Sequence, residues 1–150
     1  MPVSDAFARS NRTQTERLRS LVGRADAKML GVRLPNGWTV AGALAHIAFW
    51  DRQRLCLMRR WAAGEAASGA YDGNVFNDAV QPLFEMIAPE RVAAAALTAA
   101  EEIDAFLLEV PTPIVDTALA REDAPNLDRG SHREHHLDAV ERALSEAGYA

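Results

Sequence analysis

Apolar side chains recur along this chain at the spacing of an amphipathic helix, and no segment shows the alternation of a half-buried strand. Alanine, leucine, arginine and glutamate, which favour helices, dominate the composition, and runs of β-branched residues are missing. Helices with one apolar face become stable by packing those faces together. The sequence therefore predicts an all-α fold built as a helix bundle.

Turn and capping residues mark where the helices begin and end. Thr39 is expected to cap the second helix, and Pro89 suits the first turn of a later one. Ser131 and Glu134 have the spacing of a capping box, and Gly148 fits a C-terminal stop. The predicted helices span about residues 11–28, 39–63, 75–87, 89–109 and 131–147. The predicted turns and loops cover residues 35–37, 64–73 and 115–129, and residues 118–121 within the last of these are a candidate turn.

The long connection over residues 64–88 affects the topology. It is long enough to cross the bundle, so the second and third long helices can run in the same direction. The last helix would then run opposite to the second. Under this topology, residues near the starts of these two helices meet only if the last helix is offset along the bundle.

Size and charge limit the class of protein. The 150 residues suit one domain over residues 1–150, with 49% hydrophobic and 25% charged residues. A net charge of -5 argues against a nucleic-acid-binding face. Lys28 is the only lysine beside many arginines and alanines, which is typical of a GC-rich bacterial genome.

Cysteine usage and hydropathy bear on location. Cys56 is the only cysteine, so no internal disulfide or multi-cysteine zinc site can form, and it is interpreted as a packed or surface thiol. The first ten residues lack the apolar core of a signal peptide, and no apolar run reaches the length of a membrane span. We expect a cytoplasmic protein with no membrane partner.

Histidines provide the candidate functional site. His132 and His136 lie on the flank of the apolar arc of the last helix, whereas His135 projects toward its polar side. His46 lies at the edge of the apolar arc of the second helix. The apolar arc of the last helix consists of Leu137, Val140, Ala143, Leu144 and Ala147; that of the second consists of Ala43, Ile47, Trp50, Leu57, Met58 and Trp61.

The spacing of these histidines suits a metal ion. Two histidines four residues apart present ring nitrogens on one helix face, and a third from a neighbouring helix completes three ligands. Three protein ligands with a fourth position open to water or substrate are typical of catalytic zinc. The alternative is that His46, His132 and His136 are satisfied core residues and that no metal binds. His135 is interpreted as a solvated residue.

Short motifs in the second and last helices resemble those of the DinB-like superfamily. The matching stretches are Gly37-Trp38-Thr39-Val40, residues 44–51 (LAHIAFWD) and residues 131–136 (SHREHH), together with Asn77. The resemblance implies a four-helix bundle with a crossing between helices two and three. It also implies a divalent metal on His46, His132 and His136. A glutamate is usual at the position of His132, which weakens assignment to the mycothiol-dependent maleylpyruvate isomerases of that superfamily.

Three functional hypotheses follow. The first is a metal-dependent enzyme, a thiol S-transferase or a hydrolase that acts on a small electrophile; the superfamily includes enzymes that use low-molecular-weight thiols. Zinc is the preferred ion, with nickel, manganese or iron as alternatives. The second is a non-catalytic small-molecule-binding or stress-response protein, and the third a metal-free helical association module. A homodimer is compatible with each. Arg54, near the buried arc, is a candidate for binding an anionic group of the substrate or for pairing with an acid.

Overall fold

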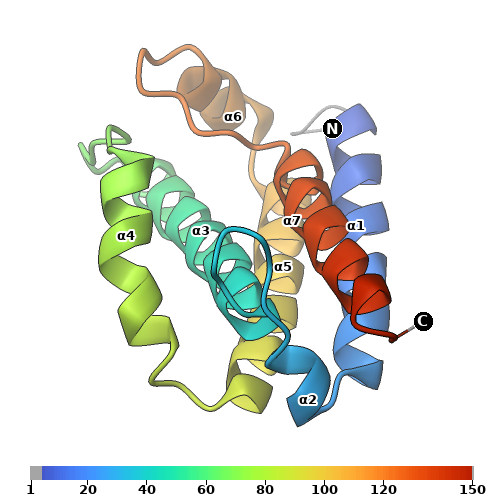
Figure 1. Cartoon of the computed structure of the whole chain (residues 1–150). Helices are drawn as coiled ribbons and strands as arrows, with labels where there is room; N and C mark the ends of the chain where they lie inside the picture. The colour runs from blue at the N-terminus through green and yellow to red at the C-terminus, as the bar shows by residue number, and fades with distance from the viewer. Residues whose placement is uncertain (1–4, 150) are drawn as a thin grey trace.

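The computed structural model describes residues 5–149, and within this range the regular secondary structure is helical, apart from one isolated bridge between Arg33 and Thr39. Figure 1 shows the seven helices. None of them, within this range, is both long and apolar enough to span a membrane. Their bounds are α1 Asp5–Arg24, α2 Ala27–Leu30, α3 Val40–Ala62, α4 Gly73–Phe84, α5 Pro89–Glu109, α6 Thr112–Leu119 and α7 Arg129–Glu146.

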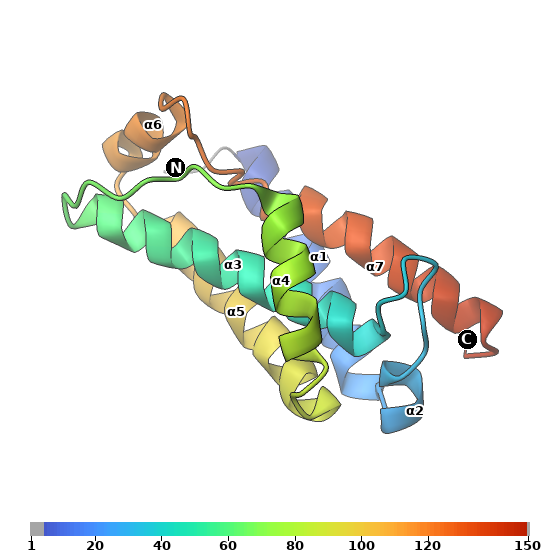
Figure 2. The same cartoon turned by 60° about the vertical axis from the view of Figure 1, so that its left-hand side comes forward.

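The four long helices α1, α3, α5 and α7 lie side by side (Figure 1). α3 and α5 run in the same direction, and α1 and α7 run in the opposite one (Figure 2). The segment over residues 63–88, which includes α4, connects the end of α3 to the start of α5. In Figure 2 this segment returns along α3, so the long connection leads to a parallel helix pair.

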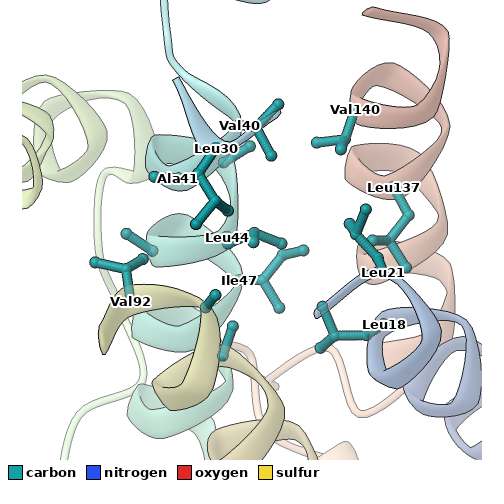
Figure 3. Packing of buried hydrophobic residues seen from close by; sticks show 14 of the residues in the cluster. Leu18, Leu21, Leu30, Val40, Ala41, Leu44, Ile47, Val92, Leu137 and Val140 are labelled. Atoms are coloured by element: carbon teal, nitrogen blue, oxygen red, sulfur yellow. The ribbon is translucent and has the colours of Figure 1, made fainter. Parts of the chain in front are cut away.

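Two apolar clusters fill the space between the helices. The larger cluster joins α1, α2, α3, α5 and α7, and Figure 3 shows Leu18 and Leu21 of α1 facing Leu44 and Ile47 of α3. Truncating one such buried leucine to alanine typically costs about 2–5 kcal/mol. The smaller cluster lies further along α3 and α5 and also takes residues from α6. Between the two clusters along α3 lies the buried carboxylate of Asp51.

The predicted long helices are confirmed where local caps define them. Thr39 Oγ1 accepts a hydrogen bond from the Gly42 amide at 2.9 Å, so α3 starts where expected. Pro89 is the first residue of α5. Gly148 adopts a φ of 89°, which suits glycine after a helix C-terminus. The first helix differs: it ends at Arg24, because Asp26 caps a separate short helix through the Met29 amide.

Several predicted boundaries were wrong. Residues 115–119, predicted as loop, belong to α6 (Thr112–Leu119), whose first turn accepts Pro113 because no backbone N–H is required there. The start of α7 is capped by Asp128, which accepts from the Ser131 amide, so the capping box from Ser131 to Glu134 is not formed. Ala147, predicted to be buried, is exposed because α7 ends one residue before it.

Candidate metal centre

The structure brings together three of the four histidines. His46 lies in the second turn of α3, and His132 and His136 are the fourth and eighth residues of α7. α7 runs opposite to α3 but is offset along it, so the start of α7 lies beside the first half of α3 (Figure 2). This offset allows residues near both helix starts to meet. His135, on the same helix, is exposed, as predicted.

The ring nitrogens have the spacing of metal ligands. Nε2 of His46 lies 3.1 Å from Nε2 of His132, and one nitrogen from each of the three rings lies within 4.8 Å of the others. Zinc binds histidine nitrogen at about 2.0–2.1 Å, which places two ligands of a tetrahedral site about 3.3 Å apart. Modest side-chain movement would therefore bring the three nitrogens around one ion.

Burial keeps these imidazoles neutral. His46 is 4% exposed, and its burial, followed by the positive charge of Arg129, lowers the pKa of His46 to about 4. Burial and the neighbouring His46 lower the pKa of His136 to about 3, and burial also lowers the pKa of His132. At neutral pH each of the three rings is therefore neutral and has one unprotonated nitrogen, the form that ligates a cation.

Arg129 determines the tautomer of His132. Its Nη2 lies 2.9 Å from Nδ1 of His132, and a guanidinium can only donate. Nδ1 of His132 therefore accepts, and the proton of the neutral ring is on Nε2, which points to Nε2 of His46. His46 then holds its own proton on Nδ1, and binding of a cation through Nε2 of His132 requires the proton there to be displaced.

A fully buried nitrogen of the site has no hydrogen-bond partner. Nδ1 of His46 is buried and unpaired among the described residues. The nearby side chain of Asn77 offsets part of the lowering of the His46 pKa by burial, but it does not form a hydrogen bond with Nδ1 of His46. A buried polar group without a partner costs about 1–3 kcal/mol. This unpaired nitrogen and the set of three nitrogen donors both fit a site that binds an ion or a ligand.

A buried ion-pair network fixes α7 beneath the histidines. Asp51 is 0% exposed; its Oδ1 accepts from Arg129 Nε at 2.8 Å and its Oδ2 accepts from Arg133 Nε at 2.8 Å. Arg133 also donates to Asp104 of α5 and to Thr15 of α1. One arginine of α7 thus joins all three neighbouring long helices and restricts where His132 and His136 can lie.

Sequence reasoning missed this network, although its spacing could have revealed it. Asp51 lies four residues after Ile47, on the buried face of α3, where an unpaired carboxylate would be very costly. Arg129 and Arg133 are four residues apart and flank His132 on α7. A carboxylate on one apolar helix face and two arginines at helical spacing on another predict a buried pair.

An open cleft of about 330 Å³ borders the three histidines. Trp38 packs against the histidines: the centroid of its ring lies 5.0 Å from that of His46 and 6.3 Å from that of His136. Trp50 donates from Nε1 to Oδ1 of Asn77 at 3.0 Å, so this asparagine of α4 belongs to the cleft wall. The residues that line the cleft are Trp38, His46, Trp50, Arg54, Tyr71, Gly73, Asn74, Asn77, Asn126, Arg129, His132, His135 and His136.

The other candidate residues lie in and around this region. His135, although exposed, is at the edge of the cleft. Arg54 is buried, as its position near the apolar arc of α3 predicts. Cys56 is an exposed thiol outside the cleft lining, which agrees with its interpretation as a surface residue. Trp61 packs against the smaller apolar cluster and donates to the Ala67 carbonyl.

Comparison with known proteins returns no relative. No family model matches the chain, and neither the curated proteins nor the solved structures give a match. The functional interpretation therefore depends on the geometry of the site and on the short motifs of α3 and α7.

Proposed function

We propose that this chain is a DinB-like four-helix bundle that holds one divalent metal ion on His46, His132 and His136. The parallel pair α3 and α5, with the long connection over residues 63–88 between them, supports this topology. The observation that carries the proposal is the approach of three neutral ring nitrogens, from two helices, to within 4.8 Å of one another.

The proposed activity is that of a metal-dependent thiol S-transferase or hydrolase acting on a small electrophile. In the described part of the chain no fourth histidine, cysteine or carboxylate joins the group, which supports a coordination position open to the cleft. A bound divalent ion would supply Lewis acidity, which favours the ionised form of a water or a thiol at neutral pH. Zinc is the preferred ion, with nickel, manganese or iron as alternatives.

The protein's own residues would orient the reactants. Three neutral imidazoles contribute no negative charge, so the full charge of the cation would be available to the reacting group. Asp51 holds Arg129 and Arg133 in place and so keeps the start of α7 against α3. Trp38 and Trp50 provide apolar walls that exclude water from one side of a bound molecule.

A specific observation also supports a second candidate, a binding protein without catalysis. His132 lies within hydrogen-bond distance of both His46 and Arg129, so protein contacts occupy both of its nitrogens without an ion. A cleft built on such a pair could hold a small molecule through Asn77 and the tryptophans. The two candidates differ in one respect: only the first requires the metal for any chemical change.

Activity measurements separate these candidates. We would assay zinc-loaded and chelator-treated protein with glutathione, mycothiol or bacillithiol and 1-chloro-2,4-dinitrobenzene, and with p-nitrophenyl acetate for hydrolysis. The proposed enzyme accelerates at least one reaction only when loaded with zinc, loses that activity in His136→Ala, and keeps it in His135→Ala. Zinc-bound protein that accelerates none of them would favour the binding protein.

A further inference from the structure

The charge of the cleft is opposite to that of the chain as a whole. The chain has 21 acidic residues against 16 lysines and arginines. Of the residues that line the cleft, however, Arg54 and Arg129 are cationic and none is acidic. Asparagines and aromatic rings provide most of the remaining wall. A cationic cleft in an acidic protein favours a negatively charged ligand.

Arg54 is a buried arginine whose guanidinium lacks a carboxylate partner and part of its hydrogen bonds. It is 4% exposed, and its guanidinium lies 5.2 Å from the ring centroid of Trp50 and 4.9 Å from that of Tyr71. Its two hydrogen bonds go to neutral acceptors, the side chains of Gln53 and Tyr71. Its Nε is buried with no partner, and within residues 5–149 no carboxylate forms an ion pair with it.

The neighbouring buried charges do not compensate for Arg54. Arg129 and Arg133 are paired with Asp51 and Asp104, which leaves the third guanidinium, that of Arg54, without a counter-ion. Burying an unpaired charge is costly, and such charges are normally paired with an ion or a ligand.

We propose that Arg54 binds an oxyanion, a carboxylate or phosphate group, of a ligand whose uncharged part lies against Trp50 and Tyr71. A planar guanidinium with free N–H groups is well suited to oxyanions, and it binds them through charge-assisted hydrogen bonds. This inference rests on the proposed function for the ligand's role as substrate, since the anion would lie in the same cleft as the three histidines. The binding itself is testable without a metal.

Calorimetric titration of the full chain tests this proposal with defined probes. Benzoate and phenyl phosphate carry the two oxyanions on the same ring, and benzamide is the neutral match. In chelator-treated protein we expect at least one anion to bind about tenfold or more tightly than benzamide, and Arg54→Gln to abolish that preference. Preference for benzoate would identify a carboxylate, and preference for phenyl phosphate a phosphate.

Arg60→Gln is the matched control, because Arg60 is an exposed arginine of the same helix. It should bind the anion as the wild type does. Equal affinity for benzamide and both anions, or anion affinity unchanged in Arg54→Gln, would overturn the proposal. If Arg54→Gln does not fold, the Arg54 Nε–H resonance of ¹⁵N-labelled wild type replaces it: benzoate or phenyl phosphate must shift this signal, and no shift would overturn the proposal.

Zinc content, measured on the same samples, separates this inference from the proposed function. Wild-type protein that binds zinc but neither anion would contradict the role of Arg54 and leave the metal centre standing. Protein that binds an anion through Arg54 but takes up no zinc would contradict the metal centre and leave the anion site standing.

Discussion

Nη2 of Arg129 lies 2.9 Å from Nδ1 of His132, so a buried cation contacts one of the three rings proposed to bind metal. Metal-binding histidines usually donate their second N–H to a carboxylate or carbonyl oxygen. Here the second nitrogen faces a group that can only donate. Arg129 is held there by Asp51, so the contact is fixed by the buried network rather than by the histidine.

Replacement of Arg129 should therefore strengthen metal binding while it weakens the fold. Arg129→Gln removes a positive charge and supplies an amide oxygen that could accept from Nδ1 of His132, which leaves Nε2 free to ligate. We expect zinc affinity to rise about tenfold in competition with a chromophoric chelator. Arg142→Gln, at an exposed arginine of the same helix, should leave affinity unchanged. Weaker zinc binding by Arg129→Gln would contradict this account of the contact.

The carboxylate of Asp51 should be essential to stability. Asp51→Asn removes the counter-ion of two buried guanidinium groups, and breaking a buried pair typically costs about 3–5 kcal/mol. Urea unfolding at pH 7 measures the loss. Glu102→Gln, which removes the partner of Arg52 in an exposed pair, should cost less than about 1 kcal/mol. Similar costs for the two variants would show that the buried network contributes little.

Close approach of α1 and α7 depends on Gly130. A Cβ at this position would lie 2.5 Å from the carbonyl carbon of Ser10, so Gly130→Ala must push the two helices apart. We expect a loss of about 1–3 kcal/mol or more in the free energy of unfolding, together with weaker metal binding. Gly23→Ala is the control, because a Cβ there meets nothing within 4 Å; it should stabilise α1 by about 0.5–1 kcal/mol. A neutral Gly130→Ala would refute the tight packing.

Stability of the metal-free protein should fall on mild acidification. Burial lowers the pKa of His46 in the folded chain to about 4, against about 6.5 for an ordinary histidine, so between these pH values the unfolded chain binds more protons. The free energy of unfolding therefore decreases as pH falls from about 6.5 toward 4, by up to about 1.4 kcal/mol per pH unit for each such histidine. Unfolding of chelator-treated protein across this range measures the slope, which His132→Gln should reduce. A flat profile would mean that the rings are not buried in neutral form.

Local signals made α3 and α5 predictable, and long-range contacts explain much of what was missed. Thr39 and Pro89 define helix starts by chemistry within one turn, and both predictions hold. α6 was missed because it is short and depends on burial of Val115 and Ala118 against other helices. The start of α7 was misplaced because Asp128 and Ser131 are both good caps, and sequence alone did not decide between them.

The candidate site was predictable in its residues but not in its environment. Helical spacing alone placed His132 and His136 on one face and His135 outside it. It did not reveal that Arg54 lacks a counter-ion, because the carboxylates that a buried arginine can reach depend on which helices are neighbours and how far they are offset. Such contacts join residues far apart in sequence, beyond the reach of helical periodicity.

Metal stoichiometry, measured by elemental analysis after zinc loading and removal of free ion, tests the central proposal most directly. The account predicts about one zinc per chain in the wild type and in His135→Ala, and almost none in folded His46→Ala, His132→Ala or His136→Ala. Wild-type protein without zinc, or zinc retained by all three ligand variants, would contradict it.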